Sequence, residues 1–172
     1  MLAWVMRRVL IIGNSGGGKS TLARRLGEKL GLAVVHLDVL FWMPGWVERE
    51  EADFRGAVAE ALAAPAWICD GNFGSTWDIR MPLADTIIWI DQPRHVCLTR
   101  AIFRVFQYRS ARRPDMAPGC REALDLAFYR FIWTYNRKVR PRLVETMATH
   151  GAHARQVRLR NDREIAAFLA EA

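Results

Sequence analysis

A glycine-rich turn early in the chain reads Gly13-Asn14-Ser15-Gly16-Gly17-Gly18-Lys19-Ser20, with Thr21 directly after it. The order of residues matches G-x-x-x-x-G-K-[ST]. Glycines at these positions let successive backbone N–H groups point at phosphate oxygens, and the amino-terminal end of a following helix adds positive charge. The motif therefore predicts that residues 13–21 bind the phosphates of a nucleoside triphosphate. The alternative is a glycine-rich turn that matches by chance.

The sequence on either side of this turn favours phosphate binding. Residues 8–12 form a short, apolar, β-branched run that predicts a buried strand. Residues 20–30 carry leucines at helical spacing and end before Gly31, where a helix stop belongs. Because a strand before the turn and a helix after it are what the mechanism requires, we expect Lys19 to contact the β- and γ-phosphates. Ser20 is expected to offer its hydroxyl to Mg²⁺.

The rest of the chain predicts strands that alternate with helices. Strands are expected at residues 33–37, 66–69, 86–90 and 156–159, and helices at 49–63, 94–108, 122–147 and after a capping Asp162. Pro141 is a point at which the helix over 122–147 could bend or break. Such alternation is typical of a parallel sheet covered on both faces. We therefore expect an α/β fold, a single three-layer P-loop NTPase domain over residues 1–172 with a five-stranded parallel sheet.

An arginine-rich insertion is expected between the fourth and fifth strands. Residues 109–121 contain two prolines and a glycine and predict a lid loop, which the helix over 122–147 follows. The net charge is +7, and residues 94–142 hold 12 basic and 3 acidic side chains, so the excess lies in this part of the chain. Such a patch attracts phosphate-bearing partners, either nucleic acid or a small phosphorylated ligand.

Cysteine content and hydropathy restrict the class of protein. Three cysteines, Cys69, Cys97 and Cys120, lack metal-ligand spacing, which favours a reduced, cytoplasmic protein without a zinc site. No apolar run approaches the roughly 20 residues of a bilayer-spanning helix. We expect no signal peptide and no membrane partner. Nothing in the sequence indicates an oligomeric state.

Two aspartates directly follow apolar strands. Asp70 ends the run at 67–69, and Asp91 ends the run at 87–90. Either carboxylate could be the acidic partner of Mg²⁺ beside the phosphate-binding turn. The alternative for each is a carboxylate in a loop at the end of a strand.

The chain resembles the adenylate kinase-like group of P-loop kinases. The resemblance is carried by the turn at 13–21, by Asp70-Gly71 at the end of a strand, and by Asp91-x-Pro93 followed by Arg100 and Arg104. It implies that Asp70 holds Mg²⁺ through water and that the two arginines contact the nucleotide and the transferring phosphoryl group. The chain departs from the AMP-site signature of adenylate kinases, because Asp70-Gly71 continues as Asn72-Phe73.

A narrower resemblance is to the bacterial family called DNA topology modulation proteins. Its residues are His36-Leu37-Asp38, the stretch at 70–74, and the stretch at 113–120. The family label comes from a phenotype, so it assigns neither a substrate nor DNA binding.

The resemblance also implies an acceptor site. In shikimate- and gluconate-kinase-like members an aspartate at the place of Asp38 contacts the acceptor hydroxyl, which it could orient or deprotonate. Arg55 and Arg80 could fork onto an acceptor carboxylate or phosphate, and Asn72 could donate a hydrogen bond to it. The alternatives are a turn carboxylate, solvated arginines and a turn asparagine. The aromatic run at 41–46 either lines the acceptor pocket or packs its own loop onto the body.

Kinases of this group close a mobile lid that brings arginines over the phosphates. Arg112, Arg113 and Arg137 are the candidate lid arginines, and a solvated basic face is the alternative. An added arginine can raise the rate of phosphoryl transfer about 10³–10⁵-fold, because the reaction depends mainly on charge stabilisation.

The expected function is Mg²⁺-assisted transfer of the γ-phosphoryl of ATP to a small-molecule or nucleotide acceptor, with catalysis by Lys19, Arg100, Arg104 and Asp38. The rival is a nucleic-acid-associated P-loop NTPase that affects DNA topology, which the basic segment supports. The rival is not favoured, because the sequence has no helix-turn-helix, zinc or RNP pattern. A bare NTPase would need a water-orienting residue, which the sequence does not identify.

Overall fold

The centre of the fold is a parallel sheet of five strands in the order β2-β5-β1-β6-β7. A computed structural model describes residues 5–108, 115–120 and 123–172. The strands are β1 (Arg8–Gly13), β2 (Val34–His36), β5 (Trp67–Asp70), β6 (Thr86–Ile90) and β7 (Arg155–Leu159). The α/β fold with a five-stranded parallel sheet is therefore confirmed, and its strands differ from the predicted ranges only at their ends.

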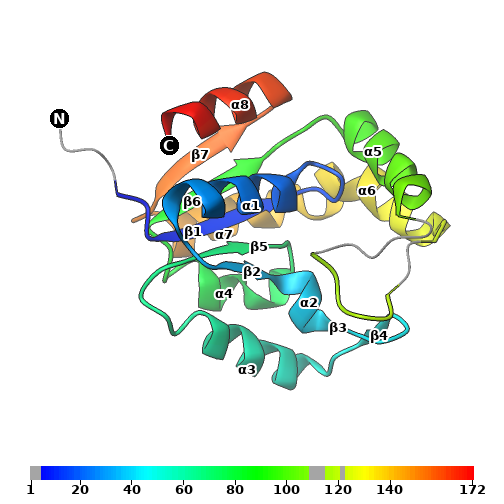
Figure 1. Cartoon of the computed structure of the whole chain (residues 1–172), viewed down its shortest axis with the longest axis horizontal. Helices are drawn as coiled ribbons and strands as arrows, with labels where there is room; N and C mark the ends of the chain where they lie inside the picture. Colours follow the sequence, from blue (N-terminus) through cyan, green and yellow to red (C-terminus); the bar gives the residue numbers. More distant parts are fainter. Residues whose placement is uncertain (1–4, 109–114, 121–122) are drawn as a thin grey trace.

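Alternate residues of the strands bury two separate hydrophobic layers, as expected for a sheet covered on both faces. Val9 and Ile11 of β1 face one layer, with α1 (Lys19–Leu30) and α8 (Asp162–Glu171). Leu10 and Ile12 face the other, with α3 (Glu51–Ala61), α4 (Trp77–Arg80) and α7 (Arg140–His150). Figure 1 shows α1 and α8 on one side of the strands and α3 and α4 on the other.

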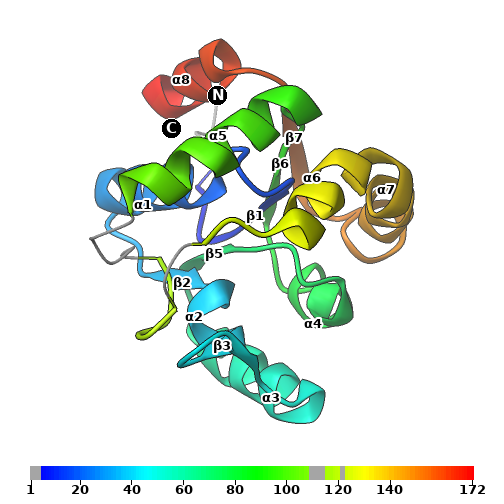
Figure 2. The same ribbon diagram turned by 90° about the vertical axis from the view of Figure 1, so that its right-hand side faces the viewer.

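Two further helices lie beyond the carboxyl end of the sheet. They are α5 (Arg94–Gln107) and α6 (Leu126–Lys138). Cys97 and Ala101 of α5 and Ile132 of α6 form a third, small hydrophobic cluster. Figure 2 shows α5 passing above α6 at this end of the molecule.

The helix predicted over 122–147 is two helices. Helix α6 ends at Lys138 and α7 begins at Arg140, with Val139 between them. Pro141 sits in the first turn of α7, where the N–H that proline lacks would have had no helical partner. The predicted cap of the last helix is also corrected. Asn161 is the N-cap, and its Oδ1 accepts from the N–H of Glu164 at 2.9 Å.

Several short elements were not predicted. Residues 37–48, which include the aromatic loop predicted at 41–46, form α2 (Leu37–Phe41) and a hairpin of β3 (Trp42–Met43) and β4 (Val47–Glu48). A 3₁₀ turn, η1 (Gly74–Thr76), precedes α4. Each is too short to show a periodic pattern in sequence.

The end of the predicted lid loop lies against this hairpin. The N–H of Gly45 donates to the carbonyl of Gly119 at 3.4 Å, and Cys120 Sγ donates to the carbonyl of Met43 at 3.3 Å. Met116 and Ala117 are buried. Of the predicted lid loop 109–121, residues 109–114 and 121 fall outside the described residues, and Arg112 and Arg113 are among them.

Within the described part of the chain, no helix is long and apolar enough to cross a bilayer. Cys69, Cys97 and Cys120 are free thiols.

Candidate active site

The turn at 13–20, called the phosphate loop below, wraps from the end of β1 to the start of α1. Gly13, Gly16 and Gly18 have φ of 149°, 80° and 99°, which favour glycine. A Cβ on Gly13 would overlap the carbonyl oxygen of Ile90, and one on Gly16 that of Cys97. The glycines therefore permit both the turn and its close contact with β6 and α5.

Lys19 is the first residue of α1, and its ammonium reaches back across the loop. Its Nζ donates to the carbonyl of Asn14 at 3.1 Å. Burial lowers the pKa of Lys19, the charges of Asp38 and Asp70 oppose the shift, and the charge of Arg104 adds to it. A cation in such a desolvated place acts strongly on a nearby phosphate. Ser20 is partly buried and Thr21 is exposed.

Asp70 ends β5 and is only 3% exposed. Its Oδ1 lies 2.5 Å from Nδ1 of His36 at the end of β2. Burial disfavours the charged imidazole, but the hydrogen bond to Asp70 and the charges of Asp70, Asp115 and Asp38 outweigh burial, so the pKa of His36 is raised. His36 had no predicted role on sequence alone. The signal that could have found it is the β2–β5 register, which places it opposite Asp70.

Asp91, the other candidate for the Mg²⁺ partner, has arginine partners instead of a histidine. Its Oδ2 accepts from Arg140 at 3.2 Å and from Arg158. Both guanidinium groups also lie over the ring of Trp89, at 5.3 and 4.7 Å from its centroid. Strand adjacency cannot decide between the two aspartates, because β5 and β6 both flank β1. Two other observations favour Asp70 as the proposed Mg²⁺ partner. The charge of Asp70 acts on Lys19, and two arginines already hold Asp91.

The two arginines predicted to share one face of α5 diverge. Arg100 pairs with Asp162 of α8 at 2.5 Å, and Gln92 donates to the same carboxylate at 2.8 Å. Asp162 on α8 thus holds the guanidinium of Arg100 in this structure, and its expected contact with the phosphoryl group stays a prediction. Arg104 acts on Lys19 through its charge, and its guanidinium lies 5.7 Å from the centroid of the Phe128 ring.

The prediction of Arg80 as an acceptor ligand is wrong. Its side chain is fully buried. It donates to the hydroxyl of Thr76 at 2.9 Å, to the carbonyls of Gly71 and Phe73 at 3.1 Å each, and to the carbonyl of Asn72. Since the guanidinium is directed at backbone carbonyls, it holds the turn after β5.

Two more of the predicted acceptor ligands, Arg55 and Asn72, have partners within the chain. Arg55 forks onto Asp78, with N–O distances of 3.0 and 2.7 Å, and donates to the carbonyl of Ser75. That ion pair joins α3 and α4, and the contact of Arg55 with an acceptor carboxylate or phosphate stays a prediction. Asn72 Oδ1 accepts from the N–H of Gly13 at 3.1 Å, so this side chain supports the start of the phosphate loop.

Asp38 lies in the first turn of α2, and its charge acts on both Lys19 and His36. Phe41, the first residue of the aromatic run behind it, packs onto the body of the protein. The Phe41 ring lies 5.0 Å from that of Phe54 and 4.7 Å from that of Phe73, and Phe41 joins the larger hydrophobic core. Phe41 thus anchors the segment that positions Asp38.

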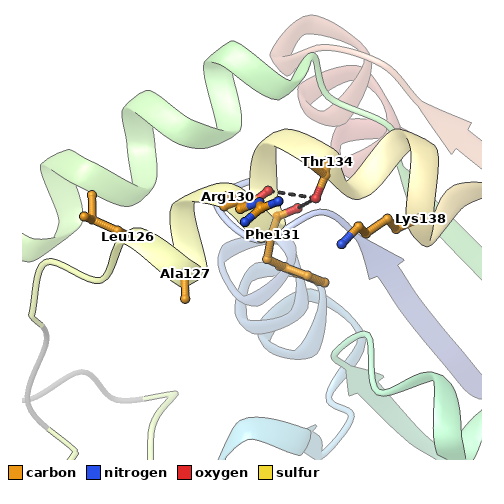
Figure 3. Close-up of a pocket in the computed structure, with 6 residues that line it drawn as sticks. All are labelled: Leu126, Ala127, Arg130, Phe131, Thr134 and Lys138. Atoms are coloured by element: carbon orange, nitrogen blue, oxygen red, sulfur yellow. Dashed lines mark hydrogen bonds between the residues drawn. The ribbon is translucent and has the colours of Figure 1, made fainter.

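One face of α6 borders a hollow of about 460 Å³. Figure 3 shows the Phe131 ring and the Lys138 side chain extending from that face. The lining also includes Arg130 and no acidic residue, so the hollow is basic. Arg137 is exposed in the last turn of α6 and is not in the lining.

Comparison with known proteins identifies the architecture. No model of a protein family matches the chain, and no curated protein matches it. The structure is similar to shikimate kinase from Acinetobacter baumannii in complex with shikimate, with a TM-score of 0.63 and 17% identity over 97% of this chain and 90% of that one. It is also similar to shikimate kinase from Bacteroides thetaiotaomicron (0.55, 16%, 96% of each chain). A third likeness is to a gluconokinase from Sinorhizobium meliloti (0.54, 14%, 96% and 88%). The chain therefore has the fold of P-loop kinases.

Proposed function

We propose that the protein is a kinase that transfers the γ-phosphoryl of ATP to a hydroxyl of a small molecule. The observation that carries this proposal is the arrangement at Lys19, whose ammonium donates to the phosphate loop and lies in the fields of Asp38 and Asp70. In this proposal the loop and Lys19 bind the phosphates, Asp70 holds Mg²⁺ through water, and Asp38 contacts the acceptor hydroxyl. The fold shared with shikimate kinase and gluconokinase supports this assignment.

The residues present fit Mg²⁺. Ser20 offers a hydroxyl and Asp70 a buried carboxylate, both hard oxygen donors. No cluster of three or more His, Cys, Asp or Glu side chains able to hold a metal occurs among the described residues. That donor set suits an ion bound by one carboxylate, by water and by the nucleotide itself. Bound there, Mg²⁺ would neutralise charge on the β- and γ-phosphates.

The chain's own residues account for the remaining chemistry. Backbone N–H groups of the phosphate loop and the ammonium of Lys19 stabilise the negative charge on the transferring group. Asp38 orients the acceptor hydroxyl and accepts its proton as the oxygen attacks phosphorus. Arg104, on the α5 side of Lys19, adds positive charge to the same place. Arg112, Arg113 and Arg137 remain candidates for closing over the phosphates.

The acceptor class is a hydroxylated small molecule rather than AMP, because Asn72-Phe73 stand where adenylate kinases carry a different signature. The test is ATP consumption by purified protein against a panel of polyols, sugar acids, hydroxy acids, nucleosides and nucleotides. We expect one class to stimulate ADP release in the wild type and not in Asp38→Asn. Stimulation by nucleotides alone, or equal stimulation in Asp38→Asn, would contradict the acceptor assignment.

The narrower resemblance to DNA topology modulation proteins stays a hypothesis that rests on the motif residues. A DNA-binding face presents many arginines to successive phosphates, and its affinity falls with salt at a log–log slope of about −0.9 per contact. Arg55, Arg100, Arg140 and Arg158 are instead held in ion pairs with carboxylates. As part of the kinase proposal, we also propose that the protein is cytoplasmic.

A further inference from the structure

Asn14, the second residue of the phosphate loop, is 3% exposed, and its side chain forms hydrogen bonds with other residues of the protein. Its Oδ1 accepts from the N–H of Ser15 at 2.9 Å. Its carbonyl accepts from the N–H of Gly17 and from Nζ of Lys19, each at 3.1 Å. One residue therefore holds both the shape of the loop and the position of its lysine.

The side-chain nitrogen of Asn14 makes its hydrogen bond to a residue outside the loop. Its Nδ2 donates to the carbonyl of Ile132, in the middle of α6, at 2.9 Å. The two residues are 118 positions apart in sequence, and the bond is buried. Around it, Ile132 packs with Cys97 and Ala101 of α5, and the carbonyl of Cys97 lies where a Cβ on Gly16 would be. The phosphate loop thus touches the α5–α6 pair through one directed hydrogen bond and one close backbone contact.

Helix α6 carries cations on the side that borders the basic hollow. Arg130 and Lys138 lie in its lining, and neither forms an ion pair within the described residues. A shift or rotation of α6 about Ile132 would move both cations relative to the phosphate loop. The bond from Asn14 opposes such movement when the loop has its present shape.

We infer that Asn14 is a positioning residue that couples occupation of the phosphate loop to the position of α6. Phosphates bind to the N–H groups of the loop, and the Asn14 side chain accepts from one of these, that of Ser15, while it donates to Ile132, so the state of the loop reaches α6 through Asn14. By linkage, anything that holds α6 in the position that nucleotide binding favours also favours phosphate binding. This inference rests on the proposed function, because it requires that the loop binds a nucleotide.

The test compares hydrogen exchange of α6 with and without a non-hydrolysable ATP analogue and Mg²⁺, in wild type and in Asn14→Ala. Gln156→Ala is the matched control, because the Gln156 amide also donates to helix-end carbonyls, those of Met147 and Gly151, far from the loop. In the wild type and the control, the analogue is expected to slow exchange at residues 126–138. In Asn14→Ala the ratio of exchange rates should fall towards one while the analogue still binds in calorimetry.

A kinetic readout separates coupling from simple support of the fold. With the best acceptor of the panel, Asn14→Ala should lower kcat by more than it raises the KM for MgATP. If Asn14→Ala does not fold, Asn14→Ser replaces it, since a serine hydroxyl can serve Ser15 but is too short to reach Ile132. Full protection of α6 in a folded variant that binds the analogue would overturn the inference alone. A wild-type chain that binds no analogue would overturn the proposed function and this inference together.

Discussion

The imidazole Nδ1 of His36 lies 2.5 Å from Oδ1 of Asp70, across neighbouring strands β2 and β5. This contact fixes the buried carboxylate that we propose as the Mg²⁺ partner. It also makes the stability of the folded chain depend on pH, because it raises the pKa of a group that titrates near neutrality.

His36 should stabilise the fold at mildly acidic pH. Its pKa is raised above the ordinary value of 6.5 by Asp70 and the neighbouring carboxylates, against the opposing effect of burial. The contribution is therefore fully present below about pH 6.5 and is lost as pH rises through the folded-state pKa. The measurement is urea unfolding of the wild type and of His36→Gln, both in EDTA. The wild type should have the larger free energy of unfolding, and the difference should be greater at pH 6 than at pH 8. A constant difference between the two pH values would contradict this account.

Asp70 and Asp91 should give opposite results on substitution. Asp70→Asn is expected to raise the Mg²⁺ concentration needed for half-maximal ATP consumption without unfolding the chain. Asp91→Asn should leave that requirement unchanged and lower stability by about 1–3 kcal/mol, because it removes the partner of Arg140 and Arg158. Mg²⁺ titrations and urea melts of both variants decide the matter. A raised requirement in the Asp91 variant alone would mean that the metal ligand has been assigned to the wrong strand.

Arg80 should matter for stability far more than Arg55. Arg80→Met leaves the carbonyls of Gly71, Asn72 and Phe73 without their buried donor, so we expect a loss of about 3 kcal/mol or more. Arg55→Met removes a half-exposed ion pair with Asp78 and should cost no more than about 1 kcal/mol. Urea unfolding measures both. Equal losses would show that Arg80 does not hold the turn after β5.

The three thiols should differ in reactivity. Burial raises the pKa of Cys69 to about 11 and also raises that of Cys97, whereas Cys120 is partly exposed. Because the thiolate is the nucleophile, iodoacetamide at pH 8 should label Cys120 well before the other two. Peptide mass spectrometry over a time course gives the order. Early labelling of Cys97 would mean that the contact between α5 and the phosphate loop opens readily.

The sheet and the phosphate loop could be predicted because their signals are local. The glycines and Lys19 lie in one short stretch, and each strand is a short apolar run ended by turn residues. The uses of the arginines could not be predicted in this way. Arg100 is held by Asp162, Arg55 by Asp78 and Arg80 by backbone carbonyls. In sequence each looks like a free cation, and only the three-dimensional fold brings its partner near.

His36 was missed for the same reason. Its role depends on a strand pairing that places it beside Asp70, 34 residues away in sequence. Asn14 was predicted as a nucleotide ligand from its position in the motif, but its side chain is used by Ser15 and by Ile132 on α6. Motif position thus indicated where the loop lies and not what each side chain within it contacts.

MgATP binding by Lys19→Ala, measured by calorimetry beside the wild type, tests the central claim most directly. We predict that the wild type binds MgATP, and that the variant keeps its fold, binds MgATP much more weakly and loses ATP consumption, since the Lys19 ammonium is a cation held against the phosphate loop. Circular dichroism of both proteins controls for folding. Equal affinity of the two proteins for MgATP would contradict the account.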